Sequence, residues 1–318
     1  MYILLRIVFV MSCLILTYIK SGYNRVINHI SEDAIMEFGQ LCLVVVLLVV
    51  RSHGLDEDIE PNDAVSNQTA TAYSAGVRMG IINPEKYSLR SFEQHERDIF
   101  KDTYREYLSL NGTQPISYQD WLVMNNYGIL LDTQESMFQR KLSKRSTADN
   151  KRRFVNTVRR GDILITGRGS GGLLGHAAIM TTDTWVLEMP GGRGWQTGIK
   201  DNNRQITKDR WFDVHASDWT TVYRCPDTGI AQQAARWADH KYYNPSGGSK
   251  KTIHITYALD PNFKSTNPSY CSKLVLQAYY FGTGSNKVIR NPGNTLIVPT
   301  TIPTYFLRPY NLANKGKF

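Results

Sequence analysis

The sequence predicts an α+β protein, because strand-like and helix-like segments fall in separate blocks along its second half. Short β-branched runs bounded by glycine or turn residues are typical of strands. They are 161–167 (GDILITG), 176–182, 184–191 and 220–225. Two segments with helical periodicity follow, 228–243 and 269–280. A block of strands followed by a block of helices indicates α+β rather than alternating α/β architecture.

The composition of the 318-residue chain, 42% apolar and 20% charged, is that of an ordinary globular protein. Its formal net charge of +9 favours anionic surroundings, among them an anionic envelope polymer. The one dense basic run, 141–153, has no interleaved aromatic residues. We therefore expect a solvated linker there and no nucleic-acid partner.

Two apolar stretches stand near the N-terminus, at 2–19 and 41–50. A membrane-spanning helix needs about 20 apolar residues, whereas the core of a signal peptide needs only about ten. We expect residues 1–51 to be a signal peptide or membrane anchor region and 52–66 to be an acidic linker. Either N-terminal segment implies export to the cell envelope or beyond, with membrane contact only through this region.

The pattern before the strands is helical, and we expect a helical region of unknown role over 67–155. Ser91 to Gln94 has the form of a capping box that begins a helix running through Leu108. Ser117 repeats this signal before a second helix.

The chain has four cysteines, Cys13, Cys42, Cys225 and Cys271. The first two lie in the N-terminal apolar stretches, and no Cys-x-x-Cys spacing indicates zinc. Cys225 and Cys271 either form one disulfide or remain free.

Cys271 falls in the first turn of the helix predicted over 269–280, and Leu274, Val275 and Ala278 lie on its face of that helix. The positive end of a helix dipole stabilises a thiolate, and the free backbone N–H groups there can hold an oxyanion. A lone cysteine is ordinarily a small buried apolar side chain. The prediction of a nucleophile therefore depends on its partners.

His176 begins a predicted strand after the glycine-rich loop 167–175, and Glu188 lies on the next strand. A turn at 182–184 places Glu188 opposite residues 177–179, next to His176. A carboxylate at that position can orient an imidazole, as in catalytic triads. The loop lacks the Lys-Ser/Thr of a phosphate cradle, so its glycines indicate a close approach of the chain to a cleft.

His215, His240 and His254 have no acidic or cysteine partners at metal-ligand spacing, and the other three histidines lie in the N-terminal region. We expect no metal site and no cofactor. His215, near Asp213 and Asp218, is the best substitute for His176 as a base.

Together, the motifs GDILITG, GHAAI, WVLEMPG and YCSKLVLQAYY resemble the circularly permuted NlpC-type papain-like peptidases of the YiiX group. In that family a His strand and a Glu strand precede the Cys helix, which reverses the order found in papain. The likeness covers about 160–310, including DHKYYN at 239–244 and an expected strand over 297–303. It implies a permuted papain-like hydrolase domain over 156–318.

By this resemblance, Cys271 is the nucleophile, His176 is its general base and Glu188 orients the histidine. Tyr270 and Gly175, which adjoin the first two, are the implied substrate-binding positions. The implied protein is an exported cysteine peptidase or amidase that needs no cofactor and cleaves amide bonds, with cell-wall peptides as the natural substrate.

Two other functions fit the same residues. A lipid-directed acyltransferase or thioesterase of the same fold needs an apolar groove, which the aromatic residues 279–281 could line. A non-catalytic envelope-binding protein would use the fold and the basic charge alone. The sequence also departs from the family at Lys273, where an acidic residue is common, and this lysine adds positive charge close to the thiol.

Overall fold

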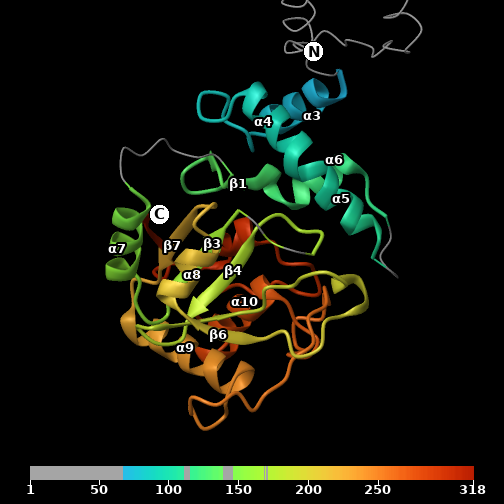
Figure 1. The fold of residues 1–318 in the computed structure, drawn as a ribbon. Helices are drawn as coiled ribbons and strands as arrows, with labels where there is room; N and C mark the ends of the chain where they lie inside the picture. The colour runs from blue at the N-terminus through green and yellow to red at the C-terminus, as the bar shows by residue number, and fades with distance from the viewer. Residues whose placement is uncertain (1–66, 111–114, 139–145, 168, 170) are drawn as a thin grey trace, which may run out of the picture. The chain divides into compact units, whose positions relative to one another are not determined.

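The main sheet of the computed structural model has six antiparallel strands in the order β6-β5-β4-β3-β7-β8 (Figure 1). The structure describes residues 67–110, 115–138, 146–167, 169 and 171–318. The strands are β3 (Ile163–Thr166), β4 (His176–Met180), β5 (Trp185–Glu188), β6 (Arg204–Thr207), β7 (Thr220–Arg224) and β8 (Ala313–Lys317). Together with the helices below, they confirm the α+β class.

Four strands, β3, β4, β5 and β7, lie in the segments that the sequence indicated. The turn between β4 and β5 places Glu188 opposite Ala178, within the expected range 177–179. The sequence does not predict the edge strands β6 and β8. Their residues, RQIT and ANKGK, lack the regular apolar alternation of a half-buried strand.

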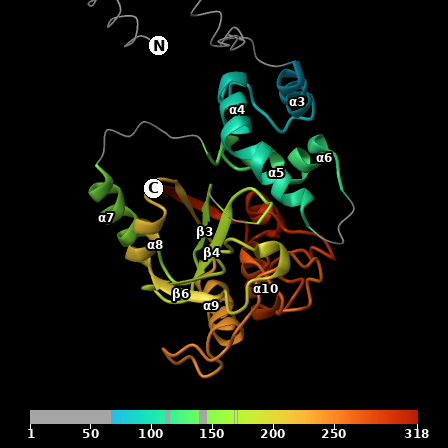
Figure 2. The ribbon, with the colours of Figure 1, turned by 45° about the vertical axis from the view of Figure 1, so that its right-hand side comes forward.

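Helices pack on both faces of this sheet (Figures 1 and 2). They are α7 (Thr147–Thr157), α8 (Lys208–Val214), α9 (Thr228–Tyr242) and α10 (Cys271–Gly282), with a short 3-10 helix, η3 (Trp195–Thr197). Successive residues of β4 face opposite ways. Ala178 packs in a core with Phe154 of α7 and Trp211 of α8, whereas Ala177 belongs to the larger core that includes α9 and α10.

The segment before the sheet is helical, as predicted, and it shares the larger core and one compact unit, Val65–Phe318, with the strands. Its elements are α3 (Asn67–Arg78), α4 (Leu89–His95), the π-helix η1 (Glu96–Phe100), α5 (Lys101–Leu108), α6 (Tyr118–Met124), the 3-10 turn η2 (Asn126–Gly128), β1 (Ile129–Leu130) and β2 (Glu135–Ser136).

Of the two helix caps that the sequence predicted, the structure moves one and confirms the other. The helical run through Leu108 begins before Ser91, because Ser88 is the N-cap and its hydroxyl accepts the N–H of Ser91 at 3.2 Å. Ser117 caps α6 as predicted and accepts the N–H of Asp120 at 3.1 Å.

The prediction of a solvated linker over 141–153 is wrong for the part that the structure describes. Residues from 147 onward form α7, which Ser146 caps with its hydroxyl. Phe154 of this helix is fully buried, with its ring centroid 5.7 Å from that of Phe212. One apolar anchor outside the basic run therefore fixes the helix against the sheet.

The strand expected over 297–303 is also wrong, because Pro299–Tyr305 form a 3-10 helix, η4. Pro299 begins this helix and Pro303 lies inside it. Proline has no N–H for a strand ladder, and its fixed φ suits a helical turn.

The export segment expected over 1–51 and the linker expected over 52–66 lie outside the described residues. Within the described part of the chain, no helix combines the length and the apolar character needed to cross a membrane.

Phe154→Ala should lower the free energy of unfolding by about 3–5 kcal/mol, because it removes a fully buried ring and leaves a cavity under α7. Asn156→Ala, at an exposed position of the same helix, is the matched control and should change stability by less than about 0.5 kcal/mol. Denaturant unfolding measures both values. Equal stability of the two variants would contradict the packing of α7.

Candidate active site

Cys271 is the first residue of α10, and the chain enters that helix from the extended residue Tyr270 (φ −151°, ψ 173°). The first helical hydrogen bond runs from the N–H of Leu274 to the carbonyl of Tyr270 at 3.0 Å. The N–H groups of the first turn, that of Cys271 included, have no acceptor within the helix and can serve an oxyanion. Cys271 is only 6% exposed.

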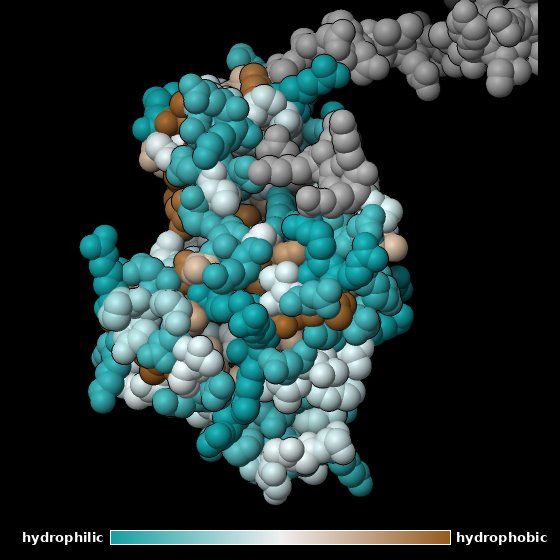
Figure 3. Space-filling model, turned by 90° about the vertical axis from the view of Figure 1, so that its left-hand side faces the viewer, coloured by the Kyte–Doolittle hydropathy of each residue, from teal (hydrophilic) through white to brown (hydrophobic). Residues whose placement is uncertain are grey.

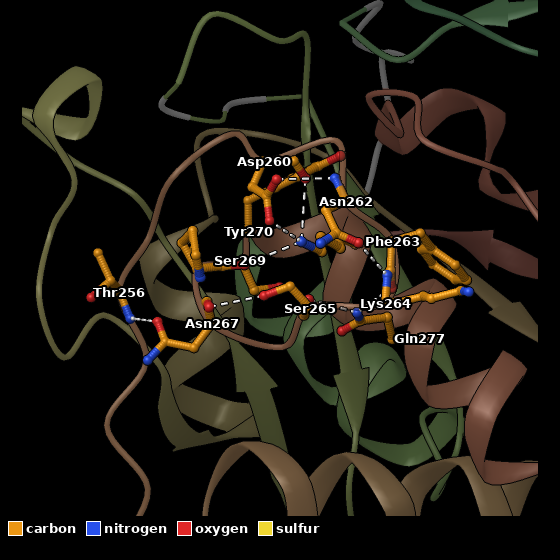
Figure 4. Close-up of polar contacts among 12 residues, drawn as sticks. Thr256, Asp260, Asn262, Phe263, Lys264, Ser265, Asn267, Ser269, Tyr270 and Gln277 are labelled. Carbon is orange, nitrogen blue, oxygen red and sulfur yellow. Dashed lines mark hydrogen bonds and ion pairs between the residues drawn. The ribbon is translucent and has the colours of Figure 1, made fainter.

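A network of polar contacts fixes the start of α10 to the loop 256–270 (Figure 4). Lys273, 1% exposed, donates from Nζ to Asp260 Oδ2 at 3.0 Å and to the carbonyl of Pro268 at 3.1 Å. One turn later, Gln277 donates to two backbone carbonyls of the same loop. The charge of Lys273 is therefore balanced by Asp260 and holds the loop, whereas the sequence led us to expect it as an added charge beside the thiol.

Strands β4, β5 and β6 carry a row of charged side chains across the sheet. Nε2 of His176 lies 2.8 Å from Oε2 of Glu188, and Nε of Arg204 donates to Oε1 of Glu188 at 2.8 Å. Burial alone would raise the pKa of Glu188, but the hydrogen bond from His176 and the charges of His176 and Arg204 hold that pKa below its usual value. Glu188 is therefore an ionised carboxylate, although it is 1% exposed.

His176 also makes a hydrogen-bonding contact with the thiol of Cys271. Because Nε2 faces Glu188, Nδ1 is the ring nitrogen left for Cys271. Burial alone would lower the pKa of His176, but the hydrogen bonds with Cys271 and Glu188 outweigh it and raise that pKa. Burial alone would likewise raise the pKa of Cys271, but the hydrogen bond and charge of His176 and an N–H of Ala177 lower it. Both shifts favour a thiolate–imidazolium pair.

Helix α6 holds the loop that leads into β4. Nε1 of Trp121 donates to the carbonyl of Gly172 at 3.0 Å, and the N–H of Leu174 donates to Oδ1 of Asn125 at 2.8 Å. Trp121 and Asn125 are both fully buried. Because these bonds fix the residues just before His176, the helical region takes part in positioning the histidine.

The two implied substrate-binding positions are both enclosed by the protein. Gly175 has a φ of +84°, which disfavours any side chain, and a Cβ there would lie 3.0 Å from the backbone oxygen of Thr166. The ring of Tyr270 is fully buried, and its hydroxyl accepts the N–H of Ile297 at 2.8 Å. Contact of either residue with a substrate stays a prediction.

The fold brings together residues that the sequence did not connect. The ring of Trp211 lies 5.5 Å from that of His176 and 4.3 Å from that of His215, measured between centroids. Ligand-capable atoms of His176, Glu188 and His215 lie within 4.8 Å of one another. Sequence spacing, on which we based the expectation of no metal site, could not show this cluster, because its members come from separate elements. Arg204 was missed for the same reason.

The disulfide alternative is wrong, because Cys225 and Cys271 are both free. Cys225 is buried beyond the end of β7, and burial raises the pKa of its thiol. The two cysteines therefore differ in electrostatic setting, and only Cys271 has an imidazole partner of the kind described above.

A thiol, an imidazole and a carboxylate in series, with the thiol at a helix N-terminus, are the groups found in enzymes that carry out acyl chemistry through cysteine. The chain belongs to the family described as lipoprotein N-acylation protein LnsA-like, which it matches over residues 121–315. The match is to this family and not directly to the NlpC-type peptidases that the motifs resemble.

A relative from Bacillus thuringiensis, described as an uncharacterized 30.3 kDa protein, is 32% identical to the chain over 223 residues. The aligned region covers 69% of this chain and 77% of that protein. No solved structure matches the chain significantly.

Cys271 should react with iodoacetamide at pH 7 at least about tenfold faster than Cys225, because its pKa is lowered whereas that of Cys225 is raised. Mass mapping of the labelled peptides measures both rates. His176→Ala should remove the difference. Equal, slow labelling of the two cysteines in the unaltered protein would exclude the thiolate.

Glu188→Gln should slow the labelling of Cys271 by about tenfold or more, since the imidazolium loses its counter-charge and the thiolate is less stabilised. Asp209→Asn, which removes an exposed carboxylate on α8, is the matched control and should leave the rate unchanged. A Glu188→Gln rate equal to that of the control would show that the carboxylate does not support the pair.

Proposed function

We propose that this protein transfers an acyl group from a lipid to an amino group of a lipoprotein, through a thioester on Cys271. Two findings support the proposal. The family to which the chain belongs is described by lipoprotein N-acylation, which is an acyl transfer. The observation that carries it is the buried Cys271–His176–Glu188 series, in which the thiol can accept and return an acyl group.

The fold that we propose for this site is the circularly permuted papain-like one. Its support is the order of the elements, since β4 carries His176, β5 carries Glu188 and α10, which carries Cys271, comes last. Helix α10, the last of these elements, packs against β4, the first of them.

In the first half of the reaction, the thiolate of Cys271 attacks the carbonyl carbon of the lipid ester. The negative charge on the carbonyl oxygen is held by the backbone N–H of Cys271. When the carbon–oxygen bond to the lipid breaks, His176 gives its Nδ1 proton to the leaving alkoxide. The products are an acyl-cysteine thioester, an alcohol and a neutral imidazole.

In the second half, the amino group of the acceptor attacks the thioester carbonyl. His176 takes a proton from the attacking nitrogen, the carbon–sulfur bond breaks, and an amide forms while the thiolate of Cys271 is restored. Glu188 stabilises the imidazolium at the beginning and end of this cycle. The residues thus begin and end in the same ionisation state.

Burial of the site favours transfer over hydrolysis. Cys271 is 6% exposed, His176 2% and Glu188 1%. A thioester in such surroundings has little access to water and lasts until an amine arrives. For this reason, together with the family match, the lipid-directed acyltransferase fits better than the amide-bond hydrolase that the sequence first indicated.

The proposal includes a location for the protein, the cell envelope. Acylated lipids and lipoproteins are membrane components, so the export and envelope location expected from residues 1–51 agree with it. The face seen in Figure 3 is mainly hydrophilic with scattered apolar patches, and the net charge of +9 attracts anionic headgroups.

The full chain, incubated with a phospholipid that carries an alkyne-tagged acyl chain, should become labelled on Cys271 through a bond that neutral hydroxylamine cleaves. An added peptide with a free N-terminal amine should then gain the acyl group as a stable amide. Cys271→Ala should abolish the label, and Cys225→Ala, the matched control, should retain it.

Label on Cys271 that always ends as free fatty acid, even with excess amine, would identify a thioesterase instead. If Cys271 gains no label but the protein cleaves a cell-wall peptide, and Cys271→Ala abolishes that cleavage, the protein is a peptidase, as the sequence first indicated.

A further inference from the structure

His215 reaches the candidate active site from the end of α8. Its ring lies 4.3 Å from that of Trp211 and 5.9 Å from that of His176, between centroids. Trp211 is fully buried and its Nε1 donates to Oγ1 of Thr220 at 3.2 Å, so the indole is a fixed surface against which His215 packs. The place of the His215 ring is therefore set by the core and not by solvent.

One nitrogen of His215 lacks a partner within the described part of the chain. Nδ1 lies 3.9 Å from Oδ2 of Asp218, whereas Nε2 is buried and has no hydrogen bond. A buried polar atom without a partner costs about 1–3 kcal/mol, so such an atom at a site of charged groups points to a missing ligand.

The groups that surround His215 have the composition of a metal site. His176, Glu188 and His215 each offer one ligand atom, and these atoms lie within 4.8 Å of one another. Two imidazoles and one carboxylate form a recurrent set for Zn²⁺, with a fourth position left open. Asp218 behind Nδ1 of His215 resembles the outer carboxylates that orient ligating histidines.

We propose that His176, Glu188 and His215 bind one zinc-class transition-metal ion, and that this ion switches the site off. The proposal needs only the side chains of this cluster and does not depend on which acyl group or acceptor the protein uses. The loss of activity that it implies does depend on Cys271 being the nucleophile.

The inhibition follows from the nitrogen that the ion would occupy. Nε2 of His176 now bonds Glu188 at 2.8 Å, and it cannot hold a metal and that hydrogen bond together. With the ion on Nε2, the one remaining ring proton stays on Nδ1, facing Cys271. In the first half of the reaction His176 must give this proton to the leaving alkoxide. An imidazole gives up its last ring proton far less readily than an imidazolium gives up one of two, so an ion on Nε2 would block the proton transfer on which the cycle depends.

The charges beside the cluster limit how tightly the ion binds. Arg204 pairs with Oε1 of Glu188 and leaves Oε2 for the metal, but its positive charge opposes a second cation. Its side chain is 46% exposed, so solvent weakens this repulsion. We therefore expect a reversible site that a chelator empties, and not a permanent structural one.

The test is calorimetric titration of the full chain with Zn²⁺ alone, in parallel with the iodoacetamide labelling of Cys271. The unaltered protein should bind one ion whose presence slows labelling, and EDTA should restore the rate. His215→Phe keeps a ring against Trp211 but removes the ligand, so it should weaken binding at least tenfold and abolish the protection. His254→Ala, which alters an exposed histidine paired with Asp201, is the control and should behave as the unaltered protein.

Circular dichroism shows whether His215→Phe is folded, and His215→Gln replaces it if it is not. Zinc that binds and protects equally well in the His215 variants would place the ion on Cys271 and His176 alone and overturn the proposal. Absence of zinc binding to the unaltered protein would also overturn it. If zinc binds as expected but no acyl transfer occurs, the proposed function is wrong and the zinc site stands.

Discussion

The hydrogen bond between His176 and Glu188 is the constraint around which the described structure is arranged. Its 2.8 Å length requires β4 and β5 to pair with Glu188 opposite Ala178, and a slip of one residue would turn either side chain to the other face of the sheet. The carboxylate is buried, and its contacts with His176 and Arg204 hold its pKa below the usual value. The register of β4 and β5 therefore also decides whether Glu188 has the partners that lower its pKa.

The position of Cys271 depends on a second set of buried polar contacts. Lys273 and Gln277 fasten α10 to the loop before it, so the helix N-terminus is held by bonds that extend beyond the apolar core. A buried charged pair contributes little net stability, but removal of one partner is costly. The pair of Lys273 and Asp260 fixes where the first turn of α10 begins, and with it the direction of the Cys271 side chain.

Local patterns predicted the central strands, the cap at Ser117 and the pairing of His176 with Glu188, because strands, caps and tight turns depend on residues that are near in sequence. They did not predict α7, in which Phe154 is the one buried side chain among mostly polar and charged residues. Arg204 was missed, and His215 was considered only as a substitute for His176 and not as its neighbour, for a different reason. Each reaches the site only through the pairing of β6 and the packing of α8, which no local pattern contains.

The two hydrogen bonds from α6 to the loop before β4 bear on how this protein can be divided. Trp121 and Asn125 belong to the helical region, yet they fix Gly172 and Leu174, close to the histidine. The match to the family begins at residue 121, at the first of these two side chains. The smallest piece that keeps the histidine in place therefore includes α6, and a graft or gene fusion that starts at the first strand of the sheet would transplant the reactive groups without the support that aligns them.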